Sequence, residues 1–228
     1  MSSLNNKPTR KAVEAVKRLW AYLRGTAHLK FQLSLSNIRK AAFLMRGYSD
    51  SDWAGDIDSR RSTTGWMVFI GLALINWISS LQSFIAQSSM EAETIAANKL
   101  LNELLYLQNM FIEAGLLPGN HSSTPIFIDN QAAIQSAHNP VGHGKTKHFD
   151  IQQFHLRENV NSGRIRLENV DTSVNPSDLL TKSLYRPTLE AHRETAGVRE
   201  VGKSAKRYFS ESDWRQSKEH RRNWESGK

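Results

Sequence analysis

The spacing of hydrophobic residues predicts helices and strands along most of the chain. Between residues 9 and 24, apolar side chains recur every three or four positions, which predicts an amphipathic helix that ends at Gly25. Residues 28–35 instead alternate between apolar and polar side chains, which predicts a strand. Residues 88–115 form the longest stretch with helical spacing, and Gly115 closes it. The chain is therefore expected to begin with a helix and a strand and to carry a long helix near its middle.

The other segments predict a mixture of strands and helices. Three consecutive strands are expected between about residues 43 and 79, with a hairpin at Gly71-Leu72 joining the second to the third. The later elements are expected to be a strand at 125–128, helices at 131–137 and 148–159, a strand at 164–170 and a helix at 175–184. This order predicts one α/β domain built on a mixed sheet.

Composition narrows the functional classes. The chain has 228 residues and no cysteine, which excludes disulfides, thiolate metal sites and a cysteine nucleophile. Its longest apolar stretch, 67–75, is far shorter than the roughly 20 residues of a membrane helix. The N-terminus lacks the apolar segment of a signal peptide. We therefore expect a soluble, intracellular protein with no membrane partner.

Charge is distributed unevenly around a net value of +8. Residues 1–46 carry a net +9 and residues 199–228 a net +4, so the body between them carries −5. Basic ends of this kind are typical of proteins that bind a phosphate polymer, because clustered Lys and Arg release counterions from it. The alternative is that these charges are ordinary solvated helix surface. The acidic body needs an explanation of its own.

Four acids of the body stand on four separate predicted elements. Asp50 lies at the first of the three consecutive strands, Glu93 near the start of the long helix, Asp129 directly after the strand 125–128, and Asp178 in the first turn of the last helix. The alternatives are an acidic turn for Asp50, a helix cap for Asp129, and a favourable position in the helix dipole for Glu93 and Asp178.

Glu91 differs from Glu93 because Ser88-x-x-Glu91 matches a capping box, which explains Glu91 structurally. If Asp50, Glu93, Asp129 and Asp178 converge at one edge of the sheet, their repulsion requires cations. Oxygen ligands without cysteine favour Mg²⁺ or Mn²⁺. Two such ions about 4 Å apart stabilise both the attacking and the leaving oxygen of a phosphoryl displacement. Together, the acids and the basic ends predict a metal-dependent enzyme that cuts a phosphate polymer.

Six sequence blocks, in this order, closely resemble the ribonuclease H domain of copia-type LTR retrotransposon Pol polyproteins. They are residues 48–56, 61–65, 88–93, 129–134, 146–151 and 175–182. The resemblance runs from about residue 8 to residue 198. It implies a ribonuclease H-like fold, a five-stranded mixed sheet flanked by helices. It also implies endonucleolytic cleavage of the RNA strand of RNA–DNA hybrids with two Mg²⁺ ions, Mn²⁺ being the alternative.

By position, the resemblance assigns metal binding and catalysis to four acids: Asp50, Glu93, Asp129 and Asp178. Residues 8–24 resemble the helix that ends the reverse transcriptase portion, which makes that portion of the same polyprotein an expected partner. The expected organisation is a reverse transcriptase remnant at 1–42, the ribonuclease H-like domain at 43–198 and a basic tail at 199–228. The tail has too few apolar residues for a core of its own, so we expect disorder or a single helix there. The expected location is the cytoplasm, a virus-like particle or the nucleus.

Two short segments are candidates for contacts with nucleic acid. Asn130 and Gln131 could bind the 2′-hydroxyls that distinguish RNA from DNA, or could cap a helix. Lys145, Lys147 and His148 could contact phosphates, or could form a solvated basic loop.

Three tryptophans, Trp53, Trp66 and Trp77, lie in predicted strand regions and are expected in the core. The competing functional hypothesis is a catalytically silent nucleic-acid-binding remnant of a decayed retroelement. The presence of all four acids argues against loss of activity by simple substitution.

Overall fold

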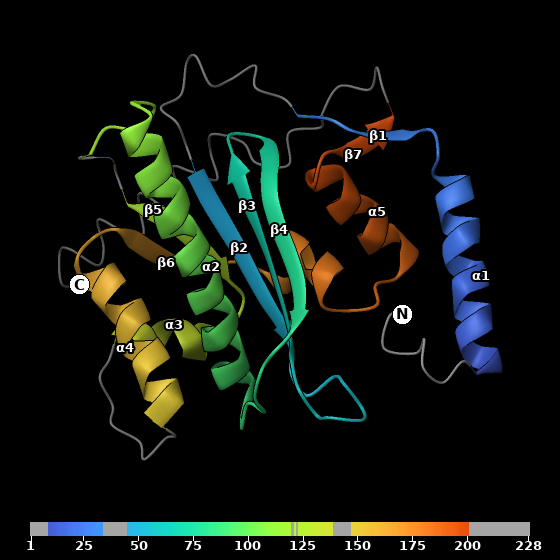
Figure 1. Ribbon diagram of the computed structural model, residues 1–228, viewed down its shortest axis with the longest axis horizontal. Coiled ribbons are helices and arrows are strands. Elements are labelled where there is room, and N and C mark those ends of the chain that lie inside the picture. Colours follow the sequence, from blue (N-terminus) through green and yellow to red (C-terminus); the bar gives the residue numbers. More distant parts are fainter. Residues whose placement is uncertain (1–8, 34–44, 120, 122, 139–146, 201–228) are drawn as a thin grey trace. The chain divides into compact units, whose positions relative to one another are not determined.

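The computed structural model describes residues 9–33, 45–119, 121, 123–138 and 147–200 (Figure 1). These residues fall into two compact units. One unit comprises the residues from Phe31 to Val198, and the other joins the residues up to Lys30 with those from Arg199.

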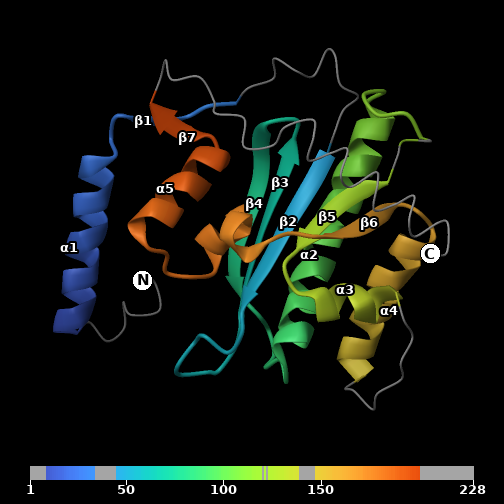
Figure 2. The same cartoon turned by 180° about the vertical axis from the view of Figure 1, so that it is seen from behind.

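The larger unit is built on a five-stranded mixed sheet. Its strands are β2 (Met45–Asp52), β3 (Thr63–Ile70), β4 (Ala73–Leu81), β5 (Thr124–Ile128) and β6 (Ile165–Asn169). The strand order is β4-β3-β2-β5-β6 (Figures 1 and 2). Strand β3 is antiparallel to both β2 and β4, whereas β5 is parallel to both β2 and β6. The expected five-stranded mixed sheet flanked by helices is confirmed. So is the β3–β4 hairpin, in which Gly71 takes a positive φ of 58°.

One face of the sheet is covered by α2 (Ser89–Glu113), which packs on β2, β3 and β5. Gly47 of β2 marks this face, because a Cβ there would lie 2.7 Å from the Leu100 side chain of α2. The helices α3 (Gln131–His138) and α4 (Lys147–Asn161) contact α2 and lie beside it in both views (Figures 1 and 2). The core between these layers includes Val68, Leu100, Leu101, Leu104, Ile126 and Ile128. The predicted elements from residue 43 to residue 170 are therefore present, with shifted ends.

The segment after β6 differs from the prediction. Instead of one helix at 175–184, the chain forms two short 3₁₀ helices, η2 (Thr172–Val174) and η3 (Pro176–Leu180). A further helix, α5 (Arg186–Thr195), was not predicted. Its sequence contains few large apolar residues, so hydrophobic spacing gave no indication of it. The prediction of a single longer helix was wrong, and η3 packs instead on β2 and β3.

The smaller unit contains α1 (Arg10–Gly25), the helix predicted at the start of the chain. The side chain of Thr9 caps it by accepting a hydrogen bond from the backbone N–H of Ala12 at 3.2 Å. The strand predicted at 28–35 is shorter, since β1 comprises Leu29–Phe31, and it pairs with β7 (Val198–Glu200). Of the predicted basic tail only the first two residues are described, and they belong to β7.

None of the helices described is both long enough and apolar enough to cross a membrane.

The expectation of three core tryptophans is correct only for Trp66, which is 6% exposed. Trp53 and Trp77 are about half exposed, at 51% and 52%. Trp53 follows the end of β2, and its indole N–H donates to the carbonyl of Ala86 at 3.0 Å. Trp77 lies on β4, the edge strand of the sheet that the structure describes, at an exposed position of a stretch in which exposed and half-buried residues alternate.

Candidate active site

The parallel pairing of β2 and β5 brings two of the predicted acids to the same edge of the sheet. Tyr48 lies opposite Phe127 in this pair. Asp50 and Asp129 each follow two residues later, so the register alone places them side by side at the carboxyl ends of the two strands. In open α/β sheets this is the edge at which ligands bind.

Glu93, near the start of α2, joins these two acids. Ser51, at the end of β2, donates to Oε1 of Glu93 from both its backbone N–H and its hydroxyl, each at 2.9 Å. Carboxylate oxygens of Asp50, Glu93 and Asp129 all lie within 4.8 Å of one another. On the side of Asp129, the hydroxyl of Thr172 in η2 donates to Oδ2 at 2.9 Å. Strand ends, a helix start and a short 3₁₀ turn thus fix three acids in one cluster.

Glu93 is 4% exposed, and its environment disfavours its charge. Burial raises the pKa of Glu93 well above its usual value, and the neighbouring carboxylates of Asp50 and Asp129 raise it further. Within the residues described, its Oε2 is buried without a hydrogen-bond partner. A buried carboxylate oxygen beside two other carboxylates is suited to a divalent cation, which would satisfy the oxygen and offset the repulsion. The cluster therefore fits the hard cation that the sequence predicts.

The fourth acid, Asp178, lies outside this group of three. It belongs to η3 and is connected to Asp50 by a lysine. The ammonium of Lys182 lies 2.9 Å from Oδ1 of Asp50 and 3.2 Å from Oδ1 of Asp178. Burial and the Asp50 carboxylate raise the pKa of Asp178 to about 6, although Lys182 opposes the shift. The structure thus places Asp178 next to Asp50, on the η3 side of the cluster.

Close packing of η3 against β3 makes this arrangement possible. Gly65 of β3 pairs directly with Asp50 of β2. A Cβ at Gly65 would lie 2.6 Å from the Thr181 side chain, 2.8 Å from Leu180 and 3.1 Å from a backbone oxygen of η3. Asn175, which is fully buried, anchors the start of η3 by donating to the carbonyl of Ser49 at 3.1 Å. The glycine is needed because any larger residue would push η3 away from the acids.

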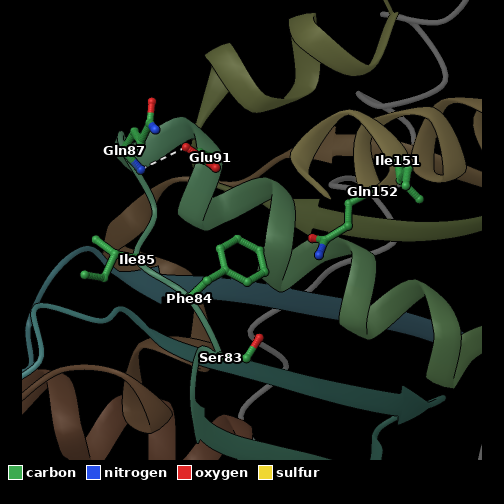
Figure 3. A pocket seen from close by; sticks show the side chains of 7 residues that line it. All are labelled: Ser83, Phe84, Ile85, Gln87, Glu91, Ile151 and Gln152. Carbon is green, nitrogen blue, oxygen red and sulfur yellow. Dashed lines mark hydrogen bonds between the residues drawn. The ribbon is translucent and has the colours of Figure 1, made fainter. Parts of the chain in front are cut away.

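Glu91, two residues before Glu93, has the structural role that the sequence predicts. Its backbone N–H donates to the Ser88 hydroxyl at 3.1 Å, and its Oε2 accepts from the backbone N–H of Gln87 at 2.8 Å. Figure 3 shows this second bond at the rim of a cavity of about 580 Å³. The seven residues lining the cavity are Ser83, Phe84, Ile85, Gln87, Glu91, Ile151 and Gln152, so it includes none of the clustered acids.

The predicted nucleic-acid contacts are described only in part. Asn130 caps α3, because its Oδ1 accepts from the backbone N–H of Ala133 at 3.0 Å, while Gln131 is exposed at the start of that helix. Lys145 lies outside the described residues, and Lys147 and His148 begin α4. A nucleic-acid contact by any of these five residues stays a prediction.

Four residues that contact the acids were not singled out by sequence reasoning: Ser51, Thr172, Thr181 and Lys182. The hydroxyl of Thr181 donates to Oδ2 of Asp50, the oxygen that Lys182 does not contact. Lys182 stands four positions after Asp178, a spacing that brings opposite charges together on one helical face. That spacing could have identified Lys182, whereas nothing in the local sequence marks Ser51 or Thr181.

Comparison with known proteins places these features in a family context. The Pol polyprotein of the transposon TNT 1-94 from Nicotiana tabacum is 34% identical over 198 residues, which cover 87% of this chain. The Pol polyprotein of the transposon RE1 from Arabidopsis thaliana is 33% identical over 202 residues, or 88% of this chain. This chain is homologous to part of the retrotransposon Pol polyproteins. The Pol homologue spans only 14% of the tobacco protein and 13% of the Arabidopsis protein.

No protein-family model matches the sequence of this Pol homologue. Among solved structures, ribonuclease H1 from Halobacterium salinarum aligns with 60% of the chain, at 12% identity and with a TM-score of 0.44. The alignment covers 93% of that enzyme.

Proposed function

We propose that this Pol homologue is a ribonuclease H that cleaves the RNA strand of RNA–DNA hybrids by metal-assisted hydrolysis. The observation that carries the proposal is the cluster of Asp50, Glu93 and Asp129, in which a buried carboxylate oxygen has no protein partner among the described residues. The homology to Pol polyproteins and the six sequence blocks support the same assignment. The +9 charge of residues 1–46 suits a phosphate polymer as substrate.

In this proposal, Asp50, Glu93, Asp129 and Asp178 hold two Mg²⁺ ions, with Mn²⁺ as the alternative. Ions held there would lower the pKa of a bound water and offset the charge that develops on the phosphate oxygens. Hydrogen bonds from neighbouring residues hold the acids in position. Ser51 fixes Oε1 of Glu93 by two hydrogen bonds and leaves Oε2 without a partner among the described residues. Thr172 orients Asp129 through its Oδ2.

We propose the reverse transcriptase portion of the same polyprotein as the partner of this domain. The argument is that the relatives extend far beyond the matched segment, since it makes up only 14% of the tobacco Pol polyprotein. Asn130, Gln131, Lys145, Lys147 and His148 are the proposed contacts to the hybrid. A location in the cytoplasm, a virus-like particle or the nucleus is part of this proposal.

A substrate comparison tests the proposed activity. Duplexes of one sequence would be prepared as RNA–DNA hybrid, double-stranded RNA and double-stranded DNA, with each strand labelled in turn. We expect Mg²⁺-dependent cleavage of the RNA strand of the hybrid alone, and no cleavage in EDTA. Salt-sensitive binding of the hybrid without turnover would instead support the catalytically silent remnant.

A further inference from the structure

Both carboxylate oxygens of Asp50 are engaged by two consecutive residues that follow η3. Oδ1 receives the ammonium of Lys182 at 2.9 Å, and Oδ2 accepts from the hydroxyl of Thr181. Asp50 itself is fully buried. Its carboxylate therefore has no oxygen free of a hydrogen-bond donor, although Asp50 belongs to the cluster that fits a divalent cation.

Lys182 is placed as a counter-ion for this buried charge. Its ammonium bridges Asp50 to Asp178, so one positive charge serves two carboxylates. Two carboxylates within hydrogen-bond distance favour the charged form of the Lys182 ammonium. An isolated buried carboxylate would be costly, and the lysine offsets that cost.

The two partners of Asp50 differ in their freedom to leave. The Lys182 side chain is 33% exposed, and its ammonium is carried on a flexible four-carbon stem. The Asp50 side chain has no exposure, so it cannot move into solvent to meet an ion. A cation that approaches Oδ1 of Asp50 meets the ammonium already bound there, and of these two groups only the lysine can withdraw toward solvent.

We propose that Lys182 is a positioning residue that holds Asp50 and Asp178 in place of a metal ion and is displaced when a divalent cation binds Asp50. Lys182 then sets the affinity of the site, because every ion that enters replaces an ammonium already bound. This inference rests on the proposed function only in requiring that the cluster bind a divalent cation. It requires neither a nucleic-acid substrate nor catalytic turnover.

Calorimetric titration of the metal-free chain with MnCl₂ or MgCl₂, without nucleic acid, tests the inference. Lys182→Met keeps much of the stem and removes the charge. We expect it to bind the metal roughly tenfold more tightly than the wild-type chain, because one unit of opposing charge is gone at close range. Arg186→Met is the matched control, since it removes one positive charge from a side chain that is 87% exposed. It should leave the metal affinity unchanged.

The outcomes separate the two proposals. If Lys182→Met binds metal as the wild type does, or more weakly, the displacement is wrong while the metal site stands. If none of the three proteins binds either cation, the proposed function and this inference both fail. Tighter binding supports the displacement, because a merely structural role for Lys182 would give weaker binding when it is lost.

A second measurement uses the wild-type chain and so remains informative if Lys182→Met does not fold. A crystal structure with Mn²⁺ at the cluster should show the Lys182 ammonium beyond hydrogen-bond distance of Asp50. An ammonium still bound to Oδ1 of Asp50 beside the ion would overturn the proposal.

Discussion

The two carboxylate oxygens of Glu93 differ in their hydrogen bonding. Ser51 stabilises one oxygen with two hydrogen bonds, while the other is buried without a partner in the part of the chain described. An unpaired buried carboxylate destabilises a folded chain, so such a residue indicates a role beyond stability. The role proposed above is cation binding.

Glu93→Gln should separate stability from metal binding. The amide removes the buried charge, so in EDTA we expect the melting temperature to stay level or rise by about 2–4 °C. We expect Mg²⁺ to raise the melting temperature of the wild type but not that of Glu93→Gln. Hybrid cleavage by the variant should fall at least roughly 100-fold. Thermal melts with EDTA and with Mg²⁺ measure the first two effects. Glu91→Gln is the control, because its carboxylate caps α2, and it should keep the response to Mg²⁺.

Asp178 predicts a pH dependence of stability in the metal-free chain. Its folded pKa of about 6 lies above the ordinary value of 3.8, so between these values the folded state binds more protons than the unfolded state. Asp178 therefore stabilises the fold fully below the lower value, and this contribution is lost as pH rises through the higher one. In EDTA, the melting temperature should fall less steeply with rising pH across this window for Asp178→Asn than for the wild type. Parallel curves for the two proteins would contradict the shift.

At this scale, sequence reasoning separated Glu91 from Glu93 because a capping box is a local pattern. It did not identify Lys182 or Thr181 as partners of Asp50, since each lies more than 130 positions away along the chain. Contacts over such separations depend on how the sheet and η3 pack. The sequence could therefore indicate the acids and, through its spacing from Asp178, Lys182, but not that Lys182 and Thr181 hold Asp50.

At the scale of the elements, the close packing of η3 against β3 depends on a single glycine of that strand, Gly65. A side chain at Gly65 would meet Thr181, Leu180 and the η3 backbone at 3.1 Å or less. The acids from β2 and β5 are set by strand register, whereas Asp178 and Lys182 reach the site only if η3 lies close to β3. A change at Gly65 should therefore affect the positions of Asp178 and Lys182 more than those of the acids on β2 and β5.

Gly65→Ala should move η3 and so detach Lys182 from Asp50. We expect a loss of stability of roughly 1–3 kcal/mol from overpacking, and a loss of cleavage that exceeds the loss of folded protein. Chemical denaturation and a cleavage assay on the folded fraction measure the two effects. Gly119→Ala is the control, because a Cβ there meets nothing within 4 Å, and it should change neither. Full activity in Gly65→Ala would show that close packing of η3 is not required.

The elements also show where hydrophobic spacing stops being informative. The five strands of the sheet are predicted from short runs of apolar and β-prone residues, and the long helix from apolar residues at helical spacing. The single helix predicted at 175–184 is instead a five-residue 3₁₀ turn, held by Asn175 and by contacts with β2 and β3. Helix α5 was missed because its burial rests on polar residues such as His192, which is 2% exposed. Tertiary packing, rather than local preference, decides both segments.

For the whole molecule, the charge distribution predicts how the substrate is held. The acidic body would repel a phosphate polymer, while residues 1–46 carry a net +9. Binding of an RNA–DNA hybrid by the Asp129→Asn variant should therefore weaken as counterions compete, by at least tenfold between about 50 and about 200 mM salt. Fluorescence anisotropy at fixed Mg²⁺ measures this. An affinity that does not change with salt would contradict binding through the basic residues.

The central claim is that the cluster of Asp50, Glu93 and Asp129 is the hydrolytic centre for the RNA strand of a hybrid. The most direct measurement is single-turnover cleavage of a hybrid labelled on its RNA strand, by the wild type, by Asp129→Asn and by Glu190→Gln. Glu190 is a surface residue paired with Arg186 outside the cluster. The account predicts Mg²⁺-dependent cleavage by the wild type and by Glu190→Gln, and at least roughly 100-fold slower cleavage by Asp129→Asn. No cleavage by the wild type, or equal rates for all three proteins, would contradict it.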